Sequence, residues 1–248
     1  MKAIILAAGR GKRLKNFTDD KPKCLNSVGG KAMLDWQVSA LRRGGVDTIM
    51  LVTGYKMEMF DRFGLKTFHN ARWESSNMVR SLLCARQEFG EPLIVSYSDI
   101  LYKDEIVRRL LSQDRDAVIT YDEEWKKLWE ERFQNPLDDA ESFRIGSDGK
   151  IRDIGRKPCS LEEIEGQYMG LMRFTPTALR WITEYTDRQD SAVLDKMDMT
   201  TLLRSLITER LSIYGMPVKG GWCEIDTIND LELANRLYDK GKSPWLFG

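Results

Sequence analysis

Short apolar runs alternate with longer amphipathic stretches over roughly the first half of the chain. Runs of four to six residues rich in apolar, aromatic or β-branched side chains predict strands, and apolar residues spaced three or four positions apart predict helices. The predicted strands are residues 2–7, 48–53, 66–69, 93–97 and 117–121. The predicted helices are residues 32–43, 78–88 and 104–112. This alternation is typical of an α/β fold with a mostly parallel sheet.

The pattern changes after residue 121. A charged helix is predicted for residues 123–133, and two short strands, 143–145 and 151–154, flank the turn sequence Asp148-Gly149. This arrangement indicates a small antiparallel insertion. The remaining predicted elements are strand 168–174, helices 176–187 and 199–211, strands 212–218 and 222–225, and helix 229–238.

Charge and composition exclude several classes of protein. Lys and Arg together number 38, as do Asp and Glu, so the chain has no overall charge that would attract nucleic acid. The longest apolar run, residues 3–8, is far too short to span a bilayer, and no signal peptide is evident. The four cysteines form no C-x-x-C pair, and His69 is the single histidine, which argues against zinc centres and His-dependent hydrolases. We therefore expect a cytoplasmic protein without a nucleic-acid or membrane partner.

A basic, glycine-rich loop follows the first predicted strand. Glycines at positions 9 and 11 let the backbone approach a ligand closely and direct its N–H groups at an anion. Residues 10–23 contain six basic and two acidic residues, in a chain that is otherwise neutral. Leu14 stands where a dinucleotide-binding fingerprint needs glycine, and Arg13 stands where a P-loop needs Ser or Thr. The pattern predicts a phosphate site of another kind, although the glycines could also form a simple strand exit.

The sequence LAAGRGKRL at residues 6–14, followed by Pro22-Lys23, resembles the signature of nucleotidyltransferases of the sugar-phosphate and choline-phosphate type. The resemblance implies a Rossmann-like sheet sandwiched by helices. It also implies that a nucleoside triphosphate binds with Mg²⁺ and that its nucleotidyl group passes to a phosphate or phosphonate oxygen, releasing pyrophosphate.

Three later segments, residues 73–82, 96–102 and 224–227, resemble cytidylyltransferases that activate phosphocholine or small phosphonates, including domains associated with phosphoenolpyruvate mutase. Ser98 stands where sugar nucleotidyltransferases usually carry glycine. The implied substrates are CTP and a small phosphonate or phosphate monoester of the 2-aminoethylphosphonate, 2-hydroxyethylphosphonate or phosphocholine type. The alternatives are a sugar-1-phosphate nucleotidylyltransferase that uses UTP, dTTP or GTP, and a non-catalytic regulatory homologue that binds nucleotide.

The resemblance also implies the domain organisation. We expect one nucleotidyltransferase domain, residues 1–248, with a nucleotide-binding core at 1–121 and 212–240 and an acceptor-binding insertion at 122–211. The apolar residues of the C-terminal segment 241–248, among them Trp245 and Phe247, leave both a monomer and a homodimer open.

Matching positions assign roles to the charged residues. Lys23 is expected to contact the α-phosphate as pyrophosphate leaves, while Arg13 and Lys12 contact the β- and γ-phosphates. Asp99 and Asp226 each follow a predicted strand and are expected to bind Mg²⁺, although either could instead cap a helix. The full set of expected nucleotide-binding residues is Leu6, Ala8, Gly9, Gly11, Lys12, Arg13, Lys23, Ser76, Asn77 and Ser81.

Asn77 and Ser81 lie four positions apart on one predicted helix, so both can reach one ligand. The resemblance places this helix start beside the base, where an amide could read cytosine. The alternative is that Asn77 or Ser76 is only a helix N-cap.

The acceptor site rests on weaker patterns. Lys157 resembles the lysine of the E-K-P element that holds the acceptor phosphate in sugar enzymes, with Arg156 in place of the glutamate. Aromatic and acidic residues after residue 120, including Trp129, could bind an ammonium group, but Trp125 and Trp129 could equally form the buried face of a helix. The expected acceptor-binding residues are Lys157, Asp122, Tyr121, Trp125, Tyr168 and Glu224.

Overall fold

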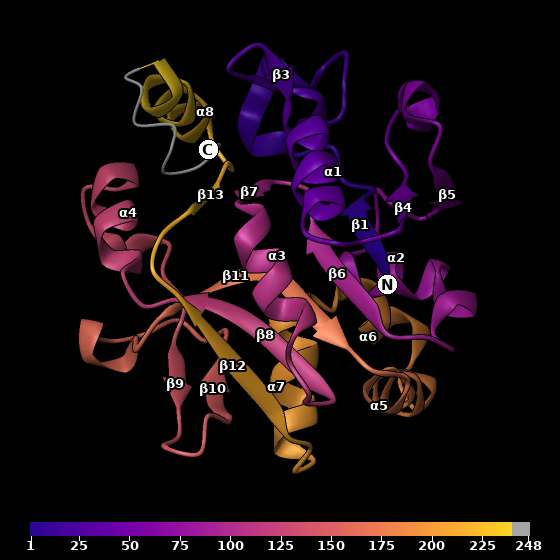
Figure 1. Cartoon of the computed structure of the whole chain (residues 1–248), viewed down its shortest axis with the longest axis vertical. Coiled ribbons are helices and arrows are strands. Elements are labelled where there is room, and N and C mark those ends of the chain that lie inside the picture. Colours follow the sequence, from indigo (N-terminus) through magenta and orange to yellow (C-terminus); the bar gives the residue numbers. More distant parts are fainter. Residues whose placement is uncertain (240–248) are drawn as a thin grey trace.

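A seven-stranded sheet runs through the computed structural model, which describes residues 1–239 (Figure 1). In spatial order its strands are β12 (Ile213–Val218), β8 (Ala117–Asp122), β11 (Gln167–Phe174), β6 (Leu93–Tyr97), β1 (Lys2–Ala7), β4 (Thr48–Thr53) and β5 (Lys66–His69). Strand β11 is antiparallel to both neighbours, and the other strands share one direction. The sheet is therefore mixed and mostly parallel, as predicted.

Three small sheets surround the main one. They pair β2 (Ser27–Val28) with β3 (Lys31–Ala32), β7 (Ile100–Tyr102) with β13 (Trp222–Glu224), and β9 (Phe143–Ile145) with β10 (Ile151–Ile154). The α-helices are α1 (Met33–Arg43), α2 (Met78–Cys84), α3 (Asp104–Leu111), α4 (Trp125–Arg132), α5 (Pro176–Asp187), α6 (Ser191–Lys196), α7 (Met199–Thr208) and α8 (Ile228–Leu237). Short 3-10 helices are η1 (Lys12–Thr18), η2 (Lys23–Leu25), η3 (Met57–Phe63), η4 (Arg86–Glu88), η5 (Pro136–Asp138) and η6 (Leu161–Glu163).

Side chains of the central strands alternate between two hydrophobic cores, one on each face of the sheet. In β1, Ala3 and Ile5 belong to the core shared with α1, α3, α4 and α8, whereas Ile4 and Leu6 belong to the core shared with α2, α5, α6 and α7. Figure 1 shows α1 and α3 in front of the sheet and α5 to α7 behind it. Because the central strands are buried on both faces, most of their residues are apolar.

Several features differ from the sequence prediction. The segment 122–211 is not only an insertion, because its strand β11 lies between β8 and β6 in the middle of the main sheet. The helix predicted for residues 78–88 ends at Cys84 and continues as η4. Strand β7 and helix α6 had no distinct sequence signal, since both are short. The apolar C-terminal segment 241–248 lies outside the described residues.

No helix within residues 1–239 has the length and apolar character needed to cross a membrane.

Candidate active site

The glycine loop makes room for Lys23. Strand β1 ends at Ala7, and Gly11 adopts the left-handed conformation, with φ of 78°. A Cβ atom at Gly11 would lie 2.6 Å from the Cβ of Lys23 and 2.7 Å from its Cδ. The missing side chain therefore lets Lys23 lie directly against the loop, which explains the glycine at this position.

Lys23 lies between two carboxylates that come from distant parts of the chain. Its Nζ is 2.9 Å from Asp99 Oδ2 and also donates to Asp226 Oδ1. Asp99 follows β6, and Asp226 follows β13. The backbone N–H of Ile225 donates to the carbonyl of Asp99 at 2.8 Å, which holds the two carboxylates side by side. Neither carboxylate caps a helix, since Thr227 and Asp230 form the capping box of α8 and Lys103 precedes α3.

The charges of this group stabilise one another. Burial lowers the pKa of Lys23, but the negative charges of Asp99 and Asp226 raise it by more, so the pKa lies above its ordinary value. Burial raises the pKa of Asp226, but Lys23 and Arg13 outweigh it, so that this pKa lies below its usual range. Arg13 Nη2 is 2.9 Å from Asp226 Oδ2. Both ionised forms are therefore favoured at neutral pH.

A buried arginine on α4 supports the carboxylates from behind. The side chain of Arg132 is fully buried, with Nη1 2.9 Å from Glu224 Oε2 and Nε 2.9 Å from Asp230 Oδ1. Asp230 Oδ2 in turn accepts the backbone N–H of Asp226 at 3.0 Å. The pKa of Glu224 is raised, mainly by burial and secondly by the negative charge of Asp226, while the positive charge of Arg132 opposes this rise. Arg132 therefore positions the segment that carries Asp226.

Asp99 and Asp226 could also hold a hard metal cation. Asp99 Oδ1 is buried and has no hydrogen-bond partner among residues 1–239. Mg²⁺ prefers oxygen ligands and is commonly bound by one or two carboxylates together with substrate phosphates. Within the same residues no group of three His, Cys, Asp or Glu side chains could hold a metal ion, so the two carboxylates suit a cation that a phosphate ligand helps to bind.

A cavity of about 370 Å³ opens beside Lys23. It is lined by every residue predicted to bind nucleotide or metal: Leu6, Ala8, Gly9, Gly11, Lys12, Arg13, Lys23, Ser76, Asn77, Ser81, Asp99 and Asp226. The carboxyl ends of β1 and β6, which are parallel neighbours, both lead into it. Ligands of open α/β sheets bind at this edge. The structure therefore brings the predicted residues together, while their individual roles stay predictions.

The predicted base-reading helix is organised by a residue with no sequence signal. The Nδ2 of buried Asn70 lies 3.0 Å from the hydroxyl oxygens of both Ser76 and Ser81. Asn77 is the N-cap of α2, and its Oδ1 accepts the N–H of Met78 at 2.8 Å, while the residue also lines the cavity. A cap and a contact with the base therefore both stay open for this residue. Trp73 also lines the cavity and packs 5.2 Å from the ring of Tyr55, so an aromatic wall stands beside these polar groups.

A second cavity of about 320 Å³ continues from the first. Arg13, Asn77, Met78, Tyr97 and Asp226 line both cavities. Two predicted acceptor residues, Tyr168 and Glu224, line the second one. It is therefore the candidate acceptor site.

Four predicted acceptor residues line neither cavity. Asp122 is buried and accepts the N–H of Gly220 at 3.0 Å and the indole N–H of Trp222 at 2.9 Å, so it anchors the loop before β13. The ring of Tyr121 stacks on Phe143, and Trp125 lies in the core. The Nζ of Lys157 donates to the carbonyl oxygens of Leu137 and Asp138. The structure does not place these four where the sequence predicted, because their side chains are used for packing and loop anchoring.

Several residues of the acceptor cavity were missed. The acidic ones are Asp139, Glu141 and Asp198. Asp139 and Glu141 follow Pro136 in an acidic stretch, and Asp198 precedes a predicted helix. In the sequence they therefore resemble ordinary polar loop residues and a helix N-cap. Only the fold brings them together.

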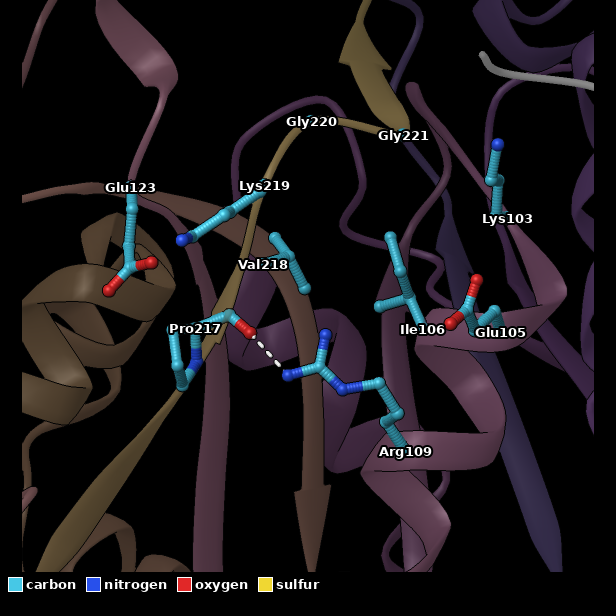
Figure 2. Close-up of a pocket in the computed structure, with 10 residues that line it drawn as sticks. All are labelled: Lys103, Glu105, Ile106, Arg109, Glu123, Pro217, Val218, Lys219, Gly220 and Gly221. Carbon is cyan, nitrogen blue, oxygen red and sulfur yellow. Dashed lines mark hydrogen bonds between the residues drawn. The ribbon is translucent and has the colours of Figure 1, made fainter. Parts of the chain in front are cut away.

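A further cavity of about 340 Å³ lies between α3 and β12 (Figure 2). Arg109 crosses it and donates to the carbonyl oxygen of Pro217 at 2.7 Å. Its lining shares no residue with the two cavities beside Lys23. It lies apart from the candidate active site.

Comparisons with known proteins show the family to which the chain belongs. The model of the MobA-like NTP transferase domain family matches residues 3–197. The chain belongs to this family. A Campylobacter jejuni protein named CTP:phosphoglutamine cytidylyltransferase is 35% identical over 94% of this chain and 98% of its own length. The choline-phosphate cytidylyltransferase of Streptococcus pneumoniae is 32% identical over 42% of this chain and 47% of its own length.

Solved structures of other NTP transferases share the fold. A CTP:phosphocholine cytidylyltransferase from Streptococcus pneumoniae has a TM-score of 0.72 and 24% identity, covering 96% of this chain and 98% of that one. A UDP-glucose pyrophosphorylase has a TM-score of 0.77 and 16% identity, covering 97% and 98%. The resemblance found in the motifs is thus confirmed, and the protein is a nucleotidyltransferase with a Rossmann-like fold.

Proposed function

We propose that the protein is a Mg²⁺-dependent cytidylyltransferase, which transfers CMP from CTP to a small acceptor bearing a phosphate or phosphonate group. The observation that carries the proposal is the position of Lys23 between Asp99 and Asp226, at the wall of a cavity that continues into a second one. The full-length similarity to a protein named CTP:phosphoglutamine cytidylyltransferase supports the choice of CTP.

In the proposed reaction an anionic oxygen of the acceptor attacks the α-phosphorus of CTP. The bond from that phosphorus to the bridging oxygen breaks, and pyrophosphate leaves with the bonding electrons. Arg13 lines both cavities and would lie where the two phosphate groups meet. Lys23 would contact the α-phosphate, so that two positive side chains offset the repulsion between polyanions.

Asp99 and Asp226 would hold Mg²⁺, with the unpartnered Asp99 Oδ1 available to it. The bound ion would supply further neutralisation of the phosphate charge. We expect a chelator to abolish turnover and added Mg²⁺ to restore it. Turnover that persists after exhaustive chelation would contradict the assignment of these carboxylates.

A substrate panel tests the activity. Purified protein is incubated with each of CTP, UTP, GTP, ATP and dTTP and with phosphoglutamine, phosphoethanolamine, phosphocholine, 2-aminoethylphosphonate, 2-hydroxyethylphosphonate, inositol 1-phosphate or glucose 1-phosphate. Pyrophosphate release should require CTP and an acceptor other than the sugar phosphate. Preference for glucose 1-phosphate with UTP or dTTP would overturn the proposal in favour of a sugar nucleotidylyltransferase, and no release in any mixture would favour a regulatory nucleotide-binding protein.

Variants of the charged group test its role. We expect Lys23→Ala and Asp99→Asn each to lower kcat by at least about 10², because each removes charge stabilisation from the transition state. Lys126→Ala removes an exposed lysine of α4 that pairs with Glu130 at the surface, and it should keep the activity of the natural protein. Normal rates in both active-site variants would refute the proposed site.

A further inference from the structure

The acceptor cavity is strongly acidic. Its lining contains the carboxylates of Asp139, Glu141, Asp198, Glu224 and Asp226, whereas Arg13 is the one basic residue among the described residues that line it. An acceptor that brought only negative charge would meet repulsion on most sides. The cavity therefore suits an acceptor whose end remote from the phosphate is positive.

Two of these carboxylates lack a positive partner. Asp226 pairs with Lys23 and Arg13, and Glu224 pairs with Arg132. Asp139 lies 3.9 Å from the guanidinium of Arg13. The carboxylate of Glu141 has no hydrogen bond or ion pair within residues 1–239, and Asp198 accepts only from the N–H of Thr201 and the hydroxyl of Thr200 in that range.

The two unpaired carboxylates also repel each other. Burial, followed by the charges of Asp198 and Asp139, raises the pKa of Glu141 to about 7. Arg204 partly opposes the rise, but its guanidinium donates to the carbonyls of Ile154 and Gly155 and forms no ion pair in the described part of the chain. A cation bound between Glu141 and Asp198 would relieve this repulsion.

The aromatic residues of the cavity do not form an open cage. The guanidinium of Arg132 lies 4.7 Å from the ring centroid of Trp129, and the rings of Trp125 and Trp222 pack against the same indole at 5.9 and 6.2 Å. Trp129 is thus already in contact with a cation. Tyr97 and Tyr168 meet edge to face at 5.8 Å. A quaternary ammonium, which is recognised mainly by several aromatic faces, finds few of them free here.

Trp129 supplies an independent sign that a ligand binds here. It lines the acceptor cavity, and only 3% of its surface is exposed. Its buried Nε1–H nevertheless has no acceptor among residues 1–239. Buried donors are normally satisfied, so an acceptor atom from a ligand is expected at this position.

We propose that the acceptor substrate carries a primary ammonium group that donates hydrogen bonds to Glu141 and Asp198, while an oxygen of the same molecule accepts the indole N–H of Trp129. This inference rests on the proposed function and narrows its substrate class. A primary ammonium has three N–H donors for the two carboxylates, whereas a trimethylammonium has none. Glu141 and Asp198 are therefore specificity-determining residues.

Acceptor pairs that differ only in methylation of the nitrogen test the proposal. The pairs are phosphoethanolamine and phosphocholine, 2-aminoethylphosphonate and its N-trimethyl derivative, and phosphoglutamine and its α-N-trimethyl derivative, each with CTP and pyrophosphate detection. The primary amine of each pair should have a kcat/KM at least about tenfold higher than its trimethylated partner, because the trimethylated group cannot form the hydrogen bonds to charged carboxylates. Equal or higher kcat/KM for the trimethylated members would overturn this inference and leave the cytidylyltransferase intact. No pyrophosphate from any acceptor would overturn both.

Substitutions assign the discrimination to the two carboxylates. Glu141→Gln and Asp198→Asn keep side-chain size, and asparagine still caps a helix, so α7 should remain folded. Each should raise KM for the primary amine at least about tenfold, with kcat at saturation changed much less. The matched control is Glu131→Gln, an exposed glutamate of α4 outside both cavities, which should leave KM unchanged. A KM in the first two variants equal to that of the control would overturn the assignment.

Discussion

At the scale of single residues, glycine and lysine act as a pair in the candidate site. The glycine loop was predicted from backbone freedom near an anion. The structure adds a second reason, because the space that a side chain at Gly11 would fill is taken by Lys23. A local pattern of residues 9–11 is thus tied to a residue a dozen positions later.

Replacing Gly11 tests this coupling. Gly11→Ala should cost about 1 kcal/mol for its left-handed backbone and should also displace Lys23, so kcat should fall at least about tenfold. Gly30→Ala is the matched control, because φ there is 77° and no atom lies within 4 Å of the added Cβ. The control should lose only the cost of the left-handed backbone, so its urea midpoint should fall less than that of Gly11→Ala, and it should keep its activity. Equal kcat in the two variants would show that Lys23 is not held by the loop.

The unpaired Glu141 predicts a pH-dependent stability. Its folded-state pKa of about 7 is above the ordinary value of 4.5, so the folded protein binds more protons between these values. Its contribution to stability therefore falls as pH rises from about 4.5 to about 7. Glu141→Gln should match the natural protein at pH 4.5 and have the higher urea midpoint at pH 8. A constant difference between the two proteins across this range would contradict the raised pKa.

At the scale of elements, α4 has a role that its pattern did not reveal. Its charged sequence with two tryptophans predicted a helix, and the structure confirms it over Trp125–Arg132. The last residue, Arg132, turns inward to Glu224 and Asp230. An arginine at the end of a polar helix gives no sequence sign of burial, since most such residues are solvated.

Removing the side chain of Arg132 should destabilise the folded protein. Arg132→Met leaves the buried carboxylate of Asp230 and the partly buried carboxylate of Glu224 without their partner, so the free energy of unfolding should fall by about 3 kcal/mol or more. Lys127→Met, which breaks only the surface pair with Glu124, should change it by less than about 1 kcal/mol. Urea denaturation measures both. A loss in the first variant no larger than in the second would show that Arg132 is dispensable.

At the scale of the whole molecule, two cores on either side of one sheet decide which groups reach solvent. Cys24 and Cys223 are buried, Cys84 is partly buried and Cys159 is exposed. Burial raises the pKa of both Cys24 and Cys223 to about 12. A thiol reacts as its thiolate, so burial and the raised pKa both slow the reaction of Cys24 and Cys223 with an alkylating reagent.

Thiol labelling follows from this distribution. Iodoacetamide at pH 8 should modify Cys159 first, and Cys24 and Cys223 should react only after denaturant is added. Peptide mass spectrometry of timed samples measures the order. Early labelling of Cys24, which is adjacent to Lys23, would show that the candidate site opens in solution.

The sequence by itself determined the parallel strands and the grouping of residues at the candidate nucleotide site, because both depend on local patterns. Buried strands are mainly apolar over a short run, and the glycine loop and Lys23 both lie within residues 6–23. Asp99 and Asp226 could be predicted as candidates since each closely follows a predicted strand, although β13 belongs to a separate small sheet. The acceptor site could be predicted only in part. Tyr168, Glu224 and Trp129 were candidates, whereas Glu141 and Asp198 come from separate elements and resemble ordinary surface or cap residues. Their proximity, and the loss of Asp122 and Trp125 to the interior, follow from the packing of β11, α4 and α7, which only the tertiary structure decided.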